Sequence, residues 1–181
     1  AWAAVREEGL AGLSLRRLAE RAGITTPTVY AYFPSKNDIY DAMFLQAAVE
    51  FEAHMLAPYR AQTPPRVIAE GLNRFLAFCT SDPVRYQLLF QRTLTDFEPS
   101  PDAYAPAVRA LDGSRARLQA AGITDPRHVD LWTALTTGLA SQQIANDPGG
   151  KRWIDLADDA SGMFLAYCLP ETKATRRSRG N

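Results

Sequence analysis

Apolar residues recur at intervals of three and four residues along almost the whole chain, and no segment alternates apolar and polar residues as a half-buried strand would. This spacing predicts an all-α protein. With 181 residues, 46% of them hydrophobic, the chain can bury a core and is too apolar to be disordered. It contains no run of the roughly 18 to 20 apolar residues that a membrane span needs. We therefore expect a cytoplasmic protein that is not embedded in a membrane.

Start and stop signals divide this pattern into about nine helices. We expect helices over residues 1–8, 15–22, 26–33, 36–58, 63–81, 82–92, 104–121, 126–146 and 151–169. Residues 1–8 read as the end of a helix whose start is absent. The segment "DPGGK", residues 147–151, lacks the earlier glycine and the following Ser or Thr of a phosphate-binding loop, so it predicts a turn between helices.

The second and third helices, with the turn between them, form the pattern of a helix-turn-helix. Ser14 is placed to cap the second helix, Gly23 fits the left-handed position that ends it, and Thr25 or Thr26 caps a short third helix. Ser35 and Asp38 form a capping box for the long fourth helix. In a helix-turn-helix the second helix of the pair enters the major groove of DNA, so we expect residues 26–33 to do so here.

The residue types on that short helix agree with a DNA contact. Ile24, Val29 and Phe33 are expected to pack inward. Hydroxyls and a proline ring remain outside, where they can bond phosphates or touch bases, at Thr26, Pro27, Thr28, Tyr30 and Tyr32. The net charge of the chain is zero, but residues 10–36 carry four basic side chains against one acidic one. The positive charge is thus gathered near this motif.

At these residues the sequence resembles the tetracycline-repressor (TetR) family of bacterial transcription regulators. The resemblance covers Gly9 to about Met43, "GLAGLSLRRLAERAGITTPTVYAYFPSKNDIYDAM". Val29 and Ile39 stand where the family pattern has leucine, which are small departures. Ala31 offers little for reading a base, so specificity would rest on its neighbours.

The resemblance implies a set of DNA contacts. They are Ser14, Arg16, Thr26, Pro27, Thr28, Tyr30, Tyr32 and Lys36. Tyr30 and Lys36 would hold phosphates, and Arg16, Thr26, Pro27, Thr28 and Tyr32 would be candidates for reading bases. Two alternatives stay open, that Ser14 only caps its helix and that Tyr30 partly packs against the first helix. Arg17 and Arg21 are expected to be solvated charges.

The resemblance also implies a functional division of the chain. Residues 1–45 would be the DNA-binding head, residues 46–170 a helical domain for ligand sensing and dimerisation, and residues 171–181 a flexible basic tail. Small residues spaced by four, three and four line one face of the eighth helix, where another helix could approach closely. The expected homodimer interface consists of Ala134, Gly138, Ser141 and Ala145 with Leu156, Ala160, Met163 and Tyr167. The alternative is that both stripes pack only within the subunit.

Helices four to seven offer the residues of a small-molecule pocket. The candidates are Phe51, His54, Met55, Asn73, Phe75, Phe78, Tyr86, Leu89, Phe90 and Tyr104. They predict an apolar or aromatic effector, although aromatic residues at helical spacing also serve as ordinary core.

Together with these patterns, the resemblance implies a ligand-responsive transcriptional regulator, most often a repressor in this family, that binds a palindromic operator in double-stranded DNA as a homodimer and is released by a small-molecule effector. A DNA-binding regulator controlled by a protein partner instead of a small molecule is the alternative. A cavity above about 300 Å³ would favour the sensor, and a dry interior would favour the partner. An enzyme is the remote alternative, because His54 and His128 are isolated from any nucleophile, base or metal-ligand motif. We expect no catalytic residue, no cofactor and no metal site.

Overall fold

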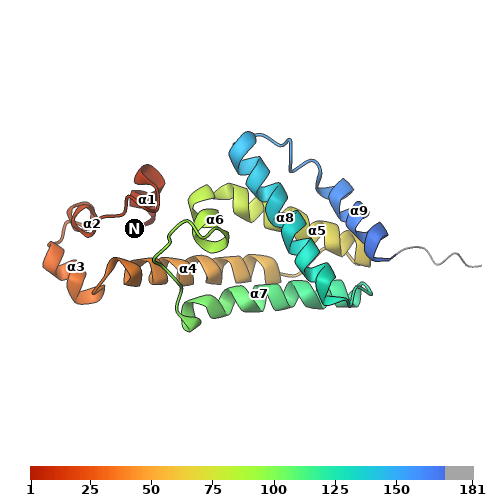
Figure 1. Ribbon diagram of the computed structural model, residues 1–181, viewed down its shortest axis with the longest axis horizontal. Helices are drawn as coiled ribbons and strands as arrows, with labels where there is room; N and C mark the ends of the chain where they lie inside the picture. The colour runs from red at the N-terminus through yellow and green to blue at the C-terminus, as the bar shows by residue number, and fades with distance from the viewer. Residues whose placement is uncertain (170–181) are drawn as a thin grey trace, which may run out of the picture. The chain divides into compact units, whose positions relative to one another are not determined.

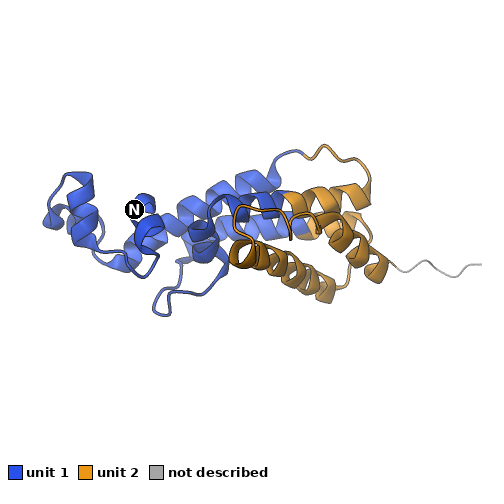
Figure 2. Cartoon of the chain, turned by 90° about the horizontal axis from the view of Figure 1, so that it is seen from above, with its two compact units in different colours: residues 1–58, 74–114 blue, residues 59–73, 115–181 orange. Residues whose placement is uncertain are grey.

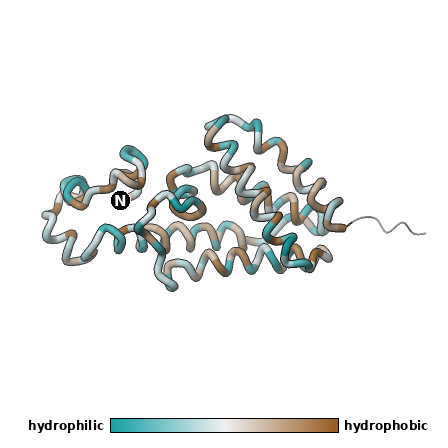
Figure 3. The backbone as a smooth tube through the Cα atoms, in the orientation of Figure 1, coloured by the Kyte–Doolittle hydropathy of each residue, from teal (hydrophilic) through white to brown (hydrophobic). Residues whose placement is uncertain are grey.

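The computed structural model describes residues 1–169. Within them the chain forms nine α-helices and no strand, which confirms the all-α prediction (Figure 1). The helices are α1 (Trp2–Glu8), α2 (Leu15–Ala22), α3 (Thr26–Tyr32), α4 (Lys36–Leu56), α5 (Pro64–Ser81), α6 (Pro83–Phe90), α7 (Pro101–Ala120), α8 (Pro126–Asn146) and α9 (Ala157–Cys168). None of the described helices is both long and apolar enough to span a bilayer. Figure 3 shows hydrophobic and hydrophilic residues following each other turn by turn along α4 and α7, as the sequence spacing predicts.

Several helix ends are set by the capping residues that the sequence indicates. Gly23 ends α2 with a φ of 66°, in the left-handed region. The Ser35 side chain accepts the N–H of Asp38 while the Asp38 carboxylate accepts the N–H of Ser35, so the capping box of α4 is complete. Asp125 caps α8 through its side chain, and Asp82, which the sequence analysis placed inside its helix, caps α6 in the same way.

Two helices begin three or more residues away from the start that the sequence predicts. We expected a ninth helix from residue 151, but α9 begins at Ala157 and the preceding residues form turns. Buried Gln143 explains the difference, because its side-chain oxygen accepts the N–H groups of Trp153 and Ile154 and satisfies them without a helix. Helix α7 begins at Pro101 rather than near residue 104, and the hydroxyl of Ser100 accepts the N–H of Ala103 at this end.

The described residues divide into two compact units, coloured separately in Figure 2. The first comprises residues 1–58 and 74–114. Its buried core joins helices α1, α2, α3 and α4 with α6, the segment before α7 and the first turn of α7. Its members include Val5, Leu10, Val29, Met43, Phe44, Leu88, Phe97 and Ala103. The helix-turn-helix and the start of α4 therefore share one hydrophobic core.

The second unit comprises residues 59–73 together with those from 115 onward. Here α8 packs against α9, with the rings of Trp132 and Phe164 4.7 Å apart. Arg117 lies over the ring of Tyr59, 4.1 Å from its centroid. The functional division expected at residue 45 differs from the boundaries of these units and stays a prediction. The expected tail, residues 171–181, lies outside the described residues.

Candidate nucleic-acid interface

The turn between α2 and α3 is fixed by backbone hydrogen bonds. The N–H of Gly23 donates to the carbonyl of Glu20 at 3.3 Å, and the N–H of Ile24 donates to the carbonyl of Ala19 at 3.0 Å. This pair of bonds is the Schellman motif, which needs a left-handed residue and so favours glycine at position 23. Ile24 differs from the expectation that it packs inward, since it is 44% exposed. The backbone bonds close the turn without its side chain.

Helix α3 is anchored on one side only. The Thr25 hydroxyl accepts the N–H of Thr28 at 3.4 Å, so Thr25, one of the two expected residues, is the N-cap. Val29 is buried and Phe33 packs partly against the same core, as predicted. The apolar side of the helix is therefore held by the head, and the opposite side is left to solvent.

The expected DNA-contacting residues of α3 lie on this solvent side. Tyr30 is 51% exposed and Tyr32 is 76% exposed. In the part of the chain that the structure describes, neither tyrosine hydroxyl has a hydrogen-bond partner. Pro27 is exposed, whereas Thr26 and Thr28 are half-buried, and the Thr28 hydroxyl lies 2.8 Å from that of Thr25. About half of Tyr30 is exposed, so its ring and hydroxyl are accessible to a ligand.

Ser14 and Arg16 lie at the start of α2. Ser14 occupies the N-cap position, but its side chain makes no capping hydrogen bond. Its hydroxyl is therefore not consumed in holding the helix. Arg16 is well exposed and pairs with Glu20 at 3.0 Å. Exposed pairs one helical turn apart contribute little, so Glu20 does not prevent Arg16 from reaching an anion.

Lys36 begins α4 and has a structural contact of its own. Its ammonium donates to the backbone carbonyl of Ala11 at 2.9 Å and lies 5.4 Å from the centroid of the Tyr40 ring. An ammonium has three donors, so two remain for a phosphate. Lys36 thus both holds the segment after α1 and presents charge at the end of α3.

The other two arginines of α2 are paired with α1. Arg17 contacts Glu8 at 2.7 Å, and Arg21 contacts Glu7 at 2.5 Å. The hydrogen bonds from Arg21 lower the pKa of Glu7. Glu8 and Glu7 thus compensate the charges of Arg17 and Arg21, as Glu20 does that of Arg16, whereas the ammonium of Lys36 bonds a backbone carbonyl.

A separate cavity of about 520 Å³ lies in the first unit. Of the predicted pocket residues, Leu89, Phe90 and Tyr104 line it. The sequence did not indicate its remaining lining, which consists of Phe44, Leu88, Gln91, Arg92, Thr93, Leu94, Phe97, Glu98 and Pro99. Most of these follow α6 in an irregular segment whose residues have no helical spacing to mark them. Among these lining residues, Phe97 alone could have been suspected from the sequence, because it is an aromatic residue within a polar loop.

The other predicted pocket residues lie elsewhere. Four aromatic residues pack with Phe90 into a cluster whose ring centroids are 5.1 to 6.1 Å apart: Phe51, Phe75, Phe78 and Tyr86. Met55 is buried. His54 and Asn73 are exposed and bond backbone carbonyls, His54 to Arg74 and Asn73 to Ala69, each at 3.0 Å. These side chains do not line the cavity.

The expected dimer residues are mostly on the surface of the second unit. Ala134, Gly138 and Ala145 are exposed, Ser141 is half-buried, Leu156, Met163 and Tyr167 are exposed, and Ala160 is buried. A Cβ on Gly138 would meet no atom within 4 Å. Two further exposed leucines, Leu131 near the start of α8 and Leu169 after α9, add to the apolar surface at the end of the pair where His128 meets Tyr167. Helix α9 of the same unit therefore does not cover most of the small residues of α8.

Comparison with known proteins gives a family for the head. Residues 1–43 match the family model described as bacterial regulatory proteins, tetR family. No curated protein matches the chain. The family resemblance drawn from the sequence is confirmed at the helix-turn-helix.

Solved structures share the fold over nearly the whole chain. A Rhodococcus sp. RHA1 protein of unknown function has a TM-score of 0.77 and 18% identity, covering 93% of this chain and 91% of that one. A TetR-family transcriptional regulator from Thermus thermophilus, PfmR, has a TM-score of 0.65 and 19% identity over 91% and 93% of the two chains. The regulator FadR from Bacillus subtilis, in complex with stearoyl-CoA, has a TM-score of 0.66 and 16% identity over 92% and 94%.

Proposed function

Because residues 1–43 are those of a TetR-family regulatory protein, we propose that this chain is a DNA-binding transcription regulator. It acts in the cytoplasm as a repressor. It binds a palindromic operator as a homodimer, and a small-molecule effector releases it from the DNA.

The exposed side of α3 carries this proposal. Its seven residues make a helix about 10 Å long at 1.5 Å per residue, which suits the major groove of about 12 Å. Val29 fixes the helix from below, while Tyr30 and Tyr32 project from the surface. A helix fixed on one side with hydroxyls and aromatic rings on the other can bond phosphates and touch base edges together.

Each contact has a proposed role. Tyr30 and Lys36 bind phosphates, Lys36 through the two donors that Ala11 leaves unused. Arg16, Thr26, Pro27, Thr28 and Tyr32 read bases, and Ser14 adds a hydroxyl at the N-terminus of α2. Because the phosphate contacts release counterions, operator affinity will fall steeply with salt.

Dimerisation through α8 and α9 completes the operator-binding unit. A single helix-turn-helix reads one half-site, so a palindrome needs two copies. The exposed small residues of α8 and the exposed Met163 and Tyr167 of α9 support this surface, since a second α8 and α9 pair could pack on it as a four-helix bundle.

The cavity supports a small-molecule effector over a protein partner. Its volume of about 520 Å³ exceeds the roughly 300 Å³ at which ligand pockets begin. Phe44, Leu88 and Phe97 give it apolar walls that suit an apolar or aromatic effector, and the rest of the lining adds polar groups from Gln91, Arg92, Thr93 and Glu98. To change operator affinity tenfold, the effector must prefer the released conformation by about 1.4 kcal/mol.

Selection of bound sequences from a random DNA pool tests the regulator. We expect a near-palindrome that is bound by the dimer. Tyr30→Phe and Lys36→Ala should weaken all selected sites alike, because phosphate contacts carry no sequence information.

Tyr40→Phe is the matched control for Tyr30→Phe. The Tyr40 hydroxyl donates to the buried carbonyl of Leu10, so its loss should lower stability but leave the salt dependence of binding unchanged. Lys36→Arg controls for the contact with Ala11, because it retains a charged donor. Absence of any enriched sequence would contradict the regulator, and a loss confined to particular bases in Tyr30→Phe would contradict the phosphate role.

A further inference from the structure

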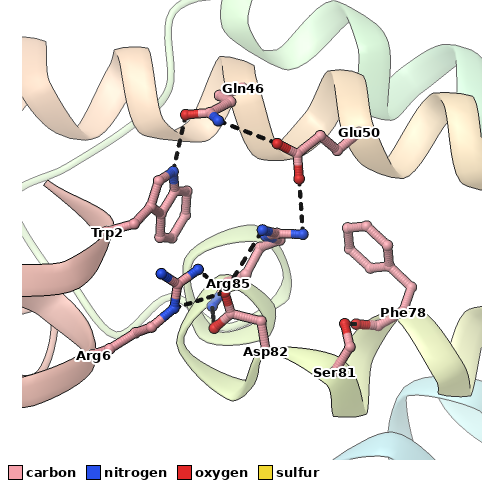
Figure 4. A network of polar contacts seen from close by, with 8 residues as sticks. All are labelled: Trp2, Arg6, Gln46, Glu50, Phe78, Ser81, Asp82 and Arg85. Carbon is pink, nitrogen blue, oxygen red and sulfur yellow. Dashed lines mark hydrogen bonds and ion pairs between the residues drawn. The ribbon is translucent and has the colours of Figure 1, made fainter.

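The two ends of helix α6 differ in how their charges are compensated. At the N-terminal end the charged side chains are paired within the protein, as Figure 4 shows. The Oδ1 of Asp82 accepts the N–H of Arg85 at 3.2 Å, and its Oδ2 accepts two nitrogens of Arg6 at 2.6 and 3.2 Å. Arg85 in turn contacts Glu50 at 2.8 Å. Two cations and two anions are matched here, so this end has no charge left for a ligand.

The C-terminal end of α6 has no such compensation. Its last turn contains no basic residue, and the backbone carbonyls of Leu88, Leu89 and Phe90 accept no backbone N–H from any residue that the structure describes. A helix end with free carbonyls carries partial negative charge and favours a cation. All three residues line the cavity of about 520 Å³. The end of α6 therefore gives one wall of the cavity a negative potential.

The segment that follows α6 adds formal negative charge. Residues 91–102 carry one basic side chain, Arg92, and three acidic ones, Asp96, Glu98 and Asp102, which gives a net charge of −2. Arg92 and Glu98 line the cavity and pair with each other. Asp96 and Asp102 lie outside the lining and form no ion pair within the described part of the chain. A ligand in the cavity thus meets more negative than positive charge.

The ion pair of Arg92 with Glu98 is easily exchanged. Both side chains are well exposed, and pairs exposed to this degree contribute little to stability. A cationic ligand can therefore take the place of Arg92 beside Glu98, and the arginine can turn to solvent. An anionic ligand could pair with Arg92 in the same way, but it would then lie close to the end of α6 and to Glu98, both of which repel it.

Aromatic rings supply a second attraction for a cation. The ring centroid of Phe44 lies 6.4 Å from that of Phe97 and 6.1 Å from that of Tyr104. All three rings line the cavity. The face of an aromatic ring is negative and attracts a cation within about 6 Å of its centroid, while the ring also offers apolar contact. The same wall can thus hold an apolar body and favour a positive group attached to it.

We propose that the effector of this cavity is an organic cation with an apolar or aromatic body. Its positive group displaces Arg92 from Glu98 and lies beside the C-terminal end of α6, and its body packs on Phe44, Phe97 and Tyr104. This rests on the proposed function, in which the cavity binds a small-molecule effector, and it adds the charge that the effector carries.

Three probes that share a phenylalkyl body and differ in their terminal group test the proposal. They are 6-phenylhexylamine, which is protonated at pH 7, the neutral 6-phenylhexan-1-ol and the anionic 6-phenylhexanoate. Isothermal titration calorimetry measures their affinities for the full chain. We expect the ammonium to bind at least about fivefold more tightly than the alcohol, and the carboxylate more weakly than the alcohol.

Two substitutions in the exchangeable pair should act in opposite directions. Glu98→Gln should weaken the ammonium by about threefold to fivefold and change the alcohol by less than about twofold, because only the charged anchor is lost. Arg92→Gln should strengthen the ammonium by about twofold or more, because it removes the cation that competes for Glu98. Glu20→Gln is the matched control, since Glu20 is another exposed carboxylate paired with an arginine but does not line the cavity. It should leave all three affinities unchanged. Circular dichroism verifies that each variant is folded.

Two results would overturn the charge of the effector alone. One is tightest binding by the carboxylate together with its loss in Arg92→Gln, which would indicate an anionic effector. The other is an ammonium that binds no better than the alcohol or whose affinity Glu98→Gln leaves unchanged. Both would leave the cavity as the site of a small molecule. Absence of binding by all three probes would contradict the small-molecule effector itself, so failure of the proposed function is distinguished from failure of this inference.

Discussion

Replacing Gln143 with methionine should destabilise the protein by about 2 to 4 kcal/mol. Gln143 is buried in α8, and its Oε1 accepts the N–H of Trp153 at 2.9 Å and of Ile154 at 3.2 Å. Its amide group donates to the carbonyl of Asp147. Methionine conserves the volume but none of these bonds. A buried polar group left without a partner costs roughly 1 to 3 kcal/mol, and because Asp147, Trp153 and Ile154 are only half-buried, water will compensate part of the three losses.

Equilibrium urea unfolding at fixed protein concentration measures this effect. Gln142→Met is the control, because Gln142 is exposed and accepts only from Asn146 at 2.7 Å, within the same helix. It should change the unfolding free energy by less than about 0.5 kcal/mol. If Gln143→Met costs under about 1 kcal/mol, the low end for one unpaired buried group, or no more than Gln142→Met, Gln143 does not hold the segment between α8 and α9.

Four further variants address the turn, a cap and the dimer. Gly23→Ala should lower the free energy of unfolding by about 1 to 2 kcal/mol, measured by thermal unfolding, because alanine disfavours the φ of 66°. A Cβ at this position would meet no atom within 4 Å, so no steric clash contributes. Gly23→Asn should cost less, and equal costs would exclude backbone strain as the cause. Hydrogen bonds from Arg127 lower the pKa of Asp125 to about 2. The stabilisation that this charged cap provides is therefore complete above the unfolded pKa of about 3.9 and is lost as pH falls toward 2. NMR titration of Asp125 should show its midpoint rising in Arg127→Gln, and an unchanged midpoint would contradict Arg127 as the cause. Met163→Glu, at a side chain that is 63% exposed, should give a helical monomer by analytical ultracentrifugation, whereas a dimer that persists would exclude this part of α9 from the interface.

Local signals in the sequence predicted the head well. Gly23, the Ser35 and Asp38 capping box and buried Val29 act within a few residues of their own positions, so their roles can be read from neighbouring letters. The prediction that Ile24 packs inward was wrong, because the hydrogen bonds of the Schellman motif close the turn without its side chain.

Features that depend on distant residues could not be predicted in this way. The start of α9 depends on Gln143, which lies ten residues before Trp153 along the chain. Arg6 and Asp82 meet across 76 residues, and a charged residue in the sequence does not indicate its partner. Most of the cavity lining could not be predicted either. It comes from the segment after α6, where no periodicity in the sequence distinguishes residues that line the cavity from residues that face solvent.

The position of Asp82 has a consequence for engineering. A chimeric sensor would join the proposed DNA-binding head, residues 1–45, to the effector domain of another regulator. Such a transplant would carry Arg6 but leave behind its acceptor, which belongs to the N-cap of α6. A working hybrid would need an acid at the equivalent cap of the recipient, or a neutral replacement for Arg6 in the transplanted piece.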